Sequence, residues 1–225
     1  MTQGGGDYKK AFGHSNSQPV LRADRSSLVC EFCFVVQNLG KGFGASSGEV
    51  TINDSVIANV DTGGEFSNSV VNVERTWLLN IPDEQTEFID DDNDGFYFSG
   101  VHTSGEPSKF VDSYVINTKD DGLDHNGARL DVSGAWIQGA DHEGIAASNA
   151  QWATIRDSVF MGNNQGVEAG YGGPAVLVTQ SVIVNNQNRT DPASPITSGI
   201  RFGDGYDGGA GAYTGHITAT YTVLH

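Results

Sequence analysis

The sequence predicts an all-β fold in which short strands wind into a single parallel β-helix. Three observations predict it. A glycine returns at a near-constant interval, short apolar stretches keep their distance from that glycine, and no stretch shows a convincing 3.6-residue apolar period over three turns. We expect each repeat to form one coil of three short strands, with about seven to nine coils in all.

The composition suits a chain that turns often and buries a core. Of 225 residues, 30 are glycine, 37% are hydrophobic and only 18% are charged, which favours strands over helices. The formal net charge of −16 repels nucleic acid and anionic membranes. No run approaches the roughly 18 apolar residues of a membrane-spanning helix. We therefore expect no nucleic acid and no membrane insertion; cations and glycans are the expected partners.

The repeat is clearest when five segments are aligned on a shared glycine. They read DGFYF at 94–98, DGLDH at 121–125, EGIAA at 143–147, QGVEA at 165–169 and SGIRF at 198–202, with steps of 27, 22, 22 and 33 residues between glycines. A period near 22 residues fits one coil stacked about 4.8 Å above the last. The longer steps predict loops at 102–109 and 187–197.

Two further strand registers precede the glycine in each repeat. The nearer one reads DSVIAN at 54–59, RTWLLN at 75–80, DSYVIN at 112–117, SGAWIQ at 133–138, DSVFMG at 157–162 and QSVIVN at 180–185. The other reads EVTIN, VVNVE, ARLDV, WATIR and AVLVT. Together with the strand after the glycine, these registers predict three strands per repeat. We expect Asn117, Asn163 and Asn185 at turns that need left-handed or bridging backbone.

Alternation along the strand after the glycine predicts which side chains stack. The inward positions are Phe96, Leu123, Ile145, Val167 and Ile200. The outward positions are Tyr97, Asp124, Ala146, Glu168 and Arg201. A second column stands just before the glycine and consists of Asp94, Asp121, Glu143, Gln165 and Ser198, with Asp120 and His142 one residue further back.

Carboxyl groups stacked about 5 Å apart must share a proton or a cation. We expect Ca²⁺, which takes six to eight oxygen ligands without strict geometry, bound by Asp94, Asp120, Asp121 and Asp124 with Glu143 within reach. The stretch DDDNDG at 90–95 begins like an EF-hand loop, but a valine stands where the bidentate glutamate belongs. The alternative is that these acids only cap turns.

The registers over roughly residues 28–225 resemble the right-handed parallel β-helix of the pectate-lyase-like superfamily, with 1–27 as a cap or frayed segment. That superfamily includes polysaccharide lyases, glycoside hydrolases, epimerases, phage tailspikes and non-catalytic adhesins, so the fold alone chooses no activity. DDGLD at 120–124 is similar to the calcium-binding aspartates of one pectate-lyase family. Those lyases use a lysine base further along the chain. Here the last lysine is Lys119, so Arg201 is the expected substitute, with a salt bridge to Glu168 as its alternative role.

A second resemblance is to polygalacturonase-type hydrolases, whose motifs run NTD, DD, GHG and RIK on successive coils. The matching stretches here are DNDG at 92–95, DDG at 120–122, DHEG at 141–144 and GIR at 199–201. The histidine is displaced by one position and the lysine is absent. This resemblance implies hydrolysis by two carboxyl groups on adjacent coils.

We therefore expect a carbohydrate-active protein, first a calcium-assisted polysaccharide lyase acting on an extracellular glycan. The alternatives are a glycoside hydrolase with paired carboxylates and a non-catalytic β-helix for glycan binding, adhesion or assembly. The expected catalytic residues are Arg201, Asp121, His142 and Glu168. The expected sugar-binding residues are Tyr97, Tyr171 and Tyr206, since aromatic rings stack on sugars.

Several smaller expectations complete the interpretation. Trp77, Trp136 and Trp152 are expected in packing, with only Trp152 outward, and His125 is expected to point inward with hydrogen-bonded nitrogens. Cys30 and Cys33 are expected as buried thiols or a local disulfide. The strand-like end ITATYTVLH predicts an exposed last coil that could join a homo-oligomer. We expect a secreted or cell-surface protein.

Overall fold

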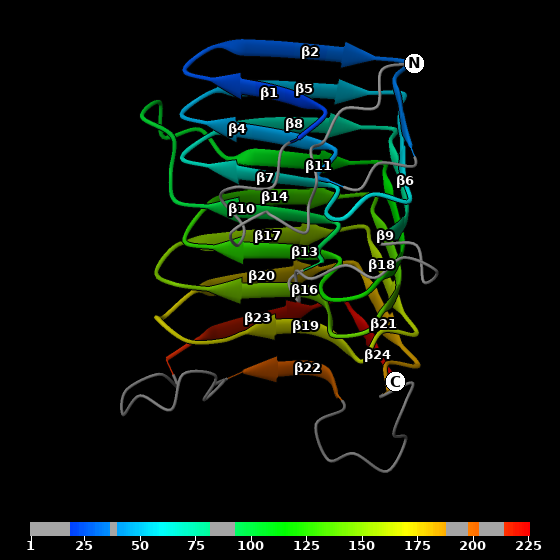
Figure 1. Cartoon of the computed structure of the whole chain (residues 1–225). Helices are drawn as coiled ribbons and strands as arrows, with labels where there is room; N and C mark the ends of the chain where they lie inside the picture. Colours follow the sequence, from blue (N-terminus) through cyan, green and yellow to red (C-terminus); the bar gives the residue numbers. More distant parts are fainter. Residues whose placement is uncertain (1–18, 37–39, 82–92, 188–197, 203–213) are drawn as a thin grey trace.

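The computed structural model describes residues 19–36, 40–81, 93–187, 198–202 and 214–225. Three eight-stranded parallel sheets form a right-handed β-solenoid, and about seven turns link the eight strands of each sheet. Successive coils stack from the N-terminal coil at the top of Figure 1 to the C-terminal coil at the bottom. The described residues form no helix, hence none long and apolar enough to cross a bilayer. The predicted fold class is confirmed.

Each coil contributes one strand to each sheet. Sheet A contains β1 (Leu21–Asp24), β4 (Phe43–Ser46), β7 (Gly64–Ser67), β10 (Phe96–Ser99), β13 (Leu123–Asn126), β16 (Glu143–Ser148), β19 (Gln165–Ala169) and β22 (Ser198–Phe202). Sheet B contains β2 (Ser27–Glu31), β5 (Glu49–Asn53), β8 (Val70–Glu74), β11 (Ser108–Val111), β14 (Arg129–Ser133), β17 (Trp152–Arg156), β20 (Ala175–Thr179) and β23 (His216–Thr220). Sheet C contains β3 (Phe34–Val36), β6 (Val56–Ala58), β9 (Trp77–Ile81), β12 (Tyr114–Thr118), β15 (Trp136–Ala140), β18 (Val159–Met161), β21 (Val182–Val184) and β24 (Val223–Leu224).

The core fills the space between the three sheets. The predicted inward residues Phe96, Leu123, Ile145 and Val167 are completely buried, and Ile200 packs against the core while remaining partly accessible. They pair in register from coil to coil, as the alignment on glycine predicts. Every coil therefore buries apolar side chains only by stacking on its neighbours.

The glycine that marks each repeat is required by close backbone approach. At Gly63, Gly95, Gly122, Gly144 and Gly166, an added Cβ would stand 2.1–2.6 Å from the carbonyl oxygen of the corresponding glycine one coil further on. Real Cβ atoms do not come so close to a backbone oxygen that is itself fixed in a ladder. The glycine register therefore sets the close stacking of the coils beside sheet A.

A left-handed residue and a buried hydroxyl group turn the chain from sheet B to sheet C. Asp54, Arg75 and Asp157 have φ near +50°, and the next residue points a small side chain inward. Backbone N–H groups donate to hydroxyl oxygens one coil away, as from Thr76 to Oγ of Ser113 at 3.0 Å. These bonds satisfy polar groups that the corner buries.

The outcome for turns and ends is mixed. Asn117 and Asn185 adopt positive φ as predicted, whereas in the coil of Asn163 it is the preceding Gly162 that does so. A loop separates β10 from β11, as predicted for this longer step, while 188–197 lies outside the described residues. β1 lies within the segment 1–27 assigned to a cap and pairs with β4. Cys30 and Cys33 form a disulfide.

The tryptophans of sheet C correct the sequence interpretation. Trp77 has 42% of its surface exposed and stacks on Tyr114, with ring centroids 3.8 Å apart. Trp136 pairs in register with Tyr114, one rung further along the same outer face. In β9 the inward position belongs to Leu78, which is completely buried. The expectation that only Trp152 points outward is therefore wrong.

Candidate functional site

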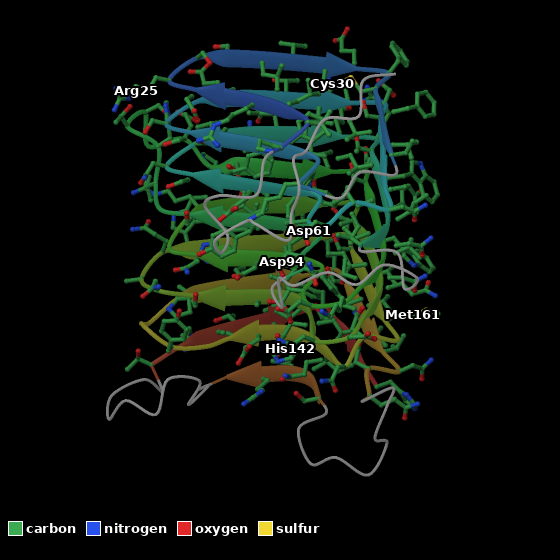
Figure 2. The ribbon with its side chains drawn as sticks, viewed as in Figure 1. Arg25, Cys30, Asp61, Asp94, His142 and Met161 are labelled. Atoms are coloured by element: carbon green, nitrogen blue, oxygen red, sulfur yellow. A yellow bond between two sulfur atoms is a disulfide. The ribbon has the colours of Figure 1, made fainter. Side chains whose placement is uncertain are left out.

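A column of polar side chains runs down the stack at the start of sheet A. The backbone N–H of Asp121 donates to Oδ1 of Asp94 at 3.1 Å, and that of Glu143 donates to Oδ1 of Asp121 at 2.8 Å. Below them, Nε2 of Gln165 donates to Oε1 of Glu143. Figure 2 shows Asp61, Asp94 and His142 following one another down this part of the stack. Hydrogen bonds between coils therefore hold Asp94, Asp121 and Glu143 in place.

His142 joins this column from one residue upstream. Its Nδ1 lies 2.6 Å from Oε2 of Glu143, 3.2 Å from Oδ1 of Asp120 and 3.4 Å from Oδ1 of Asp121. The structure brings these four side chains together. A single imidazole thus faces carboxyl groups from two consecutive coils.

Burial makes the carboxyl groups of the column weak acids. Burial, followed by the charges of Asp124, Asp121 and Asp120, raises the pKa of Asp94 well above its usual value. Burial and the charge of Glu143 raise the pKa of Asp121. Burial likewise raises the pKa of Glu143, although its interaction with His142 opposes that shift. Such groups retain a proton under conditions where exposed carboxyl groups lose it.

The pKa of His142 is also raised, but for another reason. Burial by itself lowers the pKa of His142, but hydrogen bonding to Asp120, Asp121 and Glu143 outweighs it and raises the pKa well above the ordinary value. A protonated His142 therefore supplies one positive charge to the acidic cluster. The protein thus satisfies part of the expected need for a proton or cation with its own side chain.

The column opens into a cleft of about 290 Å³ on the outer face of sheet A. Its lining consists of Tyr97, Asp120, Asp121, Asp124, Asn126, His142, Glu143, Ala146, Ala147, Ser148, Glu168, Gly170 and Tyr171. Ala146 pairs with Asp124 in register, and its small side chain leaves room beside the acids. The structure therefore brings most of the predicted site residues to one hollow.

Two tyrosines predicted to bind sugars line the cleft, while Tyr206 lies outside the described residues. The hydroxyl of Tyr97 accepts a hydrogen bond from Nδ2 of Asn126 at 2.7 Å, and Oδ1 of Asn126 accepts one from Asn149 at 2.6 Å. Sequence reasoning missed these two asparagines. The signal for Asn126 was the repeated end of sheet A strands in Asn or Ser, two positions after the outward Asp124, whereas Asn149 follows the end of β16.

Arg201 does not line the cleft. Its Nη1 donates to Oε1 of Gln165 at 3.2 Å, and its Nε lies 3.9 Å from Oε1 of Glu168. The Glu168 contact matches the alternative role given to this arginine. Among the described lining residues there is no lysine or arginine, so the cleft places carboxyl groups, a histidine and tyrosines around any bound molecule.

The chemistry of the donor set suits a divalent cation. Asp120, Asp121 and His142 each offer a ligand atom, and these atoms all lie within 4.8 Å of one another. Burial and the charges of Asp124, Asp121 and Asp120 raise the pKa of Asp94. The four aspartates predicted to bind calcium therefore interact electrostatically with one another. Oxygen-rich sets of this kind fit Ca²⁺, whereas the imidazole is a ligand for softer metals.

The polar columns continue toward the N-terminal coils, which sequence reasoning missed. Nζ of Lys41, almost completely buried, contacts Oε2 of Glu65. Nδ2 of Asn93 donates to Oδ1 of Asp61 at 2.8 Å. The glycine register could have found them, because Lys41 precedes Gly42 as Asp121 precedes Gly122.

His125 is an inward residue, as predicted, but not a hydrogen-bonded one. It is completely buried, and neither ring nitrogen has a hydrogen-bond partner among the described residues. Burial lowers its pKa, so the ring is neutral. It belongs to the core beneath the cleft and takes no part in the acidic cluster.

Comparison with known proteins identifies no relative: no family model matches the chain, and no curated protein sequence matches it. The functional argument therefore rests on the geometry of the cleft.

Proposed function

We propose that this protein hydrolyses glycosidic bonds of a neutral or lightly charged glycan by acid–base catalysis between carboxyl groups. The observation that carries the proposal is the His142 cluster, in which buried acids with raised pKa values open into a cleft beside two tyrosines. A carboxyl group that keeps its proton near neutral pH is the general acid that glycoside hydrolysis needs. The acidic lining and the net charge of −16 disfavour an anionic glycan.

Two aspartates of one coil suit the roles of general acid and general base. Asp121 would donate its proton to the leaving oxygen, because burial raises its pKa. Asp124 would accept a proton from the attacking water, since it is half-buried and lines the cleft on the outward side. Residues three apart along extended chain lie at most roughly 10 Å from each other. Inverting hydrolases hold their two carboxyl groups roughly 6.5–9.5 Å apart, and both aspartates line the same cleft.

Neighbouring groups would support this pair. Protonated His142 would stabilise the carboxylate that Asp121 becomes after it donates, because its Nδ1 lies 3.4 Å from Oδ1 of Asp121. Tyr97 and Tyr171 would hold sugar rings at the edge of the cleft. The disulfide between Cys30 and Cys33 supports a secreted or cell-surface location, where oxidising conditions preserve such bonds.

A panel of neutral and uronic-acid polysaccharides tests the proposal. We expect new reducing ends from a neutral glycan and no absorbance near ~235 nm, since hydrolysis leaves no double bond. Unsaturated products from a uronic-acid polymer would contradict hydrolysis. A panel in which no substrate is cleaved or bound would leave the cleft without a catalytic role and contradict the proposal.

The second candidate is a calcium-assisted polysaccharide lyase, favoured by the electrostatic grouping of Asp94 with Asp120, Asp121 and Asp124. Calcium bound there would neutralise a substrate carboxylate and acidify the neighbouring proton. The weakness of this candidate is its base, because Arg201 does not itself line the cleft and its guanidinium contacts Gln165 and the lining residue Glu168. Calcium titration distinguishes the candidates. A lyase requires the ion for turnover, whereas the proposed hydrolase keeps its activity in EGTA.

A further inference from the structure

Gln165 is the amide in the polar column at the start of sheet A. It follows Asp94, Asp121 and Glu143 in the position before the repeat glycine, and it is completely buried. It pairs in register with Glu143 on one side and with Ser198 on the other. Gln165 is not among the residues that line the cleft, so any effect it has on a bound glycan must pass through another side chain.

Both ends of the Gln165 amide are engaged. Its Nε2 donates to Oε1 of Glu143, and its Oε1 accepts a hydrogen bond from Nη1 of Arg201 at 3.2 Å. A guanidinium only donates hydrogen bonds, so the carbonyl end of the amide faces Arg201 and the amino end faces Glu143. A carboxylate in place of Gln165 would accept from Arg201 but would offer Glu143 no donor. The arginine thereby fixes the direction in which the amide points.

Glu143 meets a different partner on each carboxyl oxygen. Oε1 accepts from Gln165, while Oε2 lies 2.6 Å from Nδ1 of His142. The terminal torsion of a glutamate side chain is broad, so a partner on Oε1 is needed to keep Oε2 in one place. The same histidine nitrogen lies 3.4 Å from Oδ1 of Asp121. The position of the imidazole beside Asp121 therefore depends on how the carboxyl group of Glu143 is held.

We propose that Gln165 is a positioning residue of the hydrolase, oriented in turn by Arg201. Through Glu143 it holds the imidazole of His142 beside the proton donor Asp121. This inference rests on the proposed function, in which His142 stabilises the carboxylate that Asp121 becomes. Such stabilisation is effective only when the charged group already stands where the new charge develops. Gln165 thus supports the reaction without touching the substrate.

The same arrangement gives Arg201 a role other than the base suggested by the resemblance to lyases. Its Nη1 reaches Gln165, and its Nε lies 3.9 Å from Oε1 of Glu168. An arginine side chain stays protonated in proteins, and its planar fork presents several donors to neighbouring acceptors. Arg201 is therefore suited to fixing side chains beside the cleft rather than to removing a proton from a sugar.

The competing role for Gln165 is purely structural, because buried polar groups need hydrogen-bond partners in any protein. That role predicts a loss of stability with no selective loss of kcat. Gln165→Met distinguishes the two roles, since methionine is similar in length and flexibility but has no N–H to donate. On the glycan that the wild type cleaves, we expect kcat at least about tenfold lower and KM within about twofold.

Variants of Arg201 test the second link of the chain. Arg201→Met removes the donor that orients the amide of Gln165, and we expect a smaller fall in kcat than for Gln165→Met. Arg201→Lys keeps a charged donor for Oε1 of Gln165 and should restore most of that loss. An Arg201→Lys protein as slow as Arg201→Met would show that the amide is not oriented by a hydrogen bond from this position, which contradicts the proposal.

Gln151→Met is the matched control. Oε1 of Gln151 also accepts a hydrogen bond from an arginine one coil away, Nε of Arg129 at 3.0 Å, but Gln151 does not line the cleft. This variant should keep the kcat and KM of the wild type, and circular dichroism should confirm that all variants fold. A Gln165→Met protein with the kcat of the wild type, or an equal fall of kcat in Gln151→Met, overturns the proposal.

A measurement on the ring itself separates this inference from the proposed function. In NMR spectra of protein with isotope-labelled histidine, we expect a slowly exchanging Nδ1–H signal from His142, identified by its absence from His142→Gln. The signal should broaden or vanish in Gln165→Met and persist in Gln151→Met. This pattern in a protein that cleaves no glycan would refute the hydrolase and support the positioning of the ring. A signal that is unchanged in Gln165→Met overturns the inference.

Discussion

Nδ1 of His142 lies 2.6 Å from Oε2 of the completely buried Glu143. The two residues are adjacent in sequence, yet their side chains meet because one belongs to each of the two polar columns that precede the repeat glycine. The histidine thereby introduces a positive charge beside acids that burial alone would force to keep their protons. Stability and proposed catalysis both depend on this cluster.

Removing the imidazole should destabilise the protein. His142→Ala leaves Asp120, Asp121 and Glu143 facing one another without their cation, and we expect a loss of about 2–4 kcal/mol near pH 6 and a smaller one near pH 8, since a group whose pKa is raised on folding contributes fully only below its unfolded pKa. Urea unfolding at both pH values measures it. His216→Ala, at an exposed position of β23, is the control and should stay within about 0.5 kcal/mol. Equal losses for the two variants would contradict the cluster's role.

Lowering the pH toward mild acid should stabilise the fold. The pKa values of Asp94, Asp121 and Glu143 are raised on folding, so their contribution is complete below the unfolded pKa near ~4 and is lost as pH rises. His142, whose pKa is also raised, contributes fully below ~6.5 and less above it. Both effects act in the same direction.

We therefore expect Tm to rise as pH falls from about 8 to about 5. Below about 4 the trend should reverse as carboxylates in exposed ion pairs protonate. Asp54 is one such group, since its hydrogen bond from Arg75 lowers its pKa. Differential scanning calorimetry in buffers of equal ionic strength measures this dependence. A Tm that falls steadily from pH 8 to pH 5 would show that the acids are not proton-sharing.

The glycine register should tolerate no side chain. At Gly122, a Cβ would meet the carbonyl oxygen of Gly144 and Cγ2 of Ile137, each at 2.5 Å. We expect Gly122→Ala to cost more than about 2 kcal/mol, because a backbone oxygen in a stacked coil cannot move aside. Gly162→Ala, where nothing lies within 4 Å but φ is +67°, should cost about 1 kcal/mol. Chemical unfolding measures the free energy of unfolding of both variants. Similar small losses of stability in the two would contradict the close stacking of the coils.

The fold could be predicted because its cause repeats along the chain. Each coil needs a glycine for close approach and alternating apolar residues for the core, so both leave a period in the sequence. The same register predicts that Asp121, Glu143 and His142 lie together, because residues that align between repeats stack on one another in a β-helix.

What the register could not give is the direction of long side chains at the ends of strands. Arg201 shares the outward column of Glu168, but its guanidinium reaches Gln165 rather than the cleft. Trp77 is expected in packing because it falls in a predicted strand with only Trp152 facing outward, whereas Leu78 occupies the inward position beside it. His125 is expected to be hydrogen-bonded, yet within the described part of the chain neither of its ring nitrogens has a hydrogen-bond partner.

The most direct test of the proposed hydrolysis is the turnover and stability of Asp121→Asn on whichever glycan the wild type cleaves. The amide has the size of a protonated carboxyl group and can still accept the N–H of Glu143, but it cannot supply a proton. We predict turnover at least about 100-fold lower, unrestored by calcium, with Tm near pH 8 unchanged or higher. Asp157→Asn, at an exposed corner, should keep full turnover. An Asp121→Asn protein that cleaves its glycan at the wild-type rate would contradict the account.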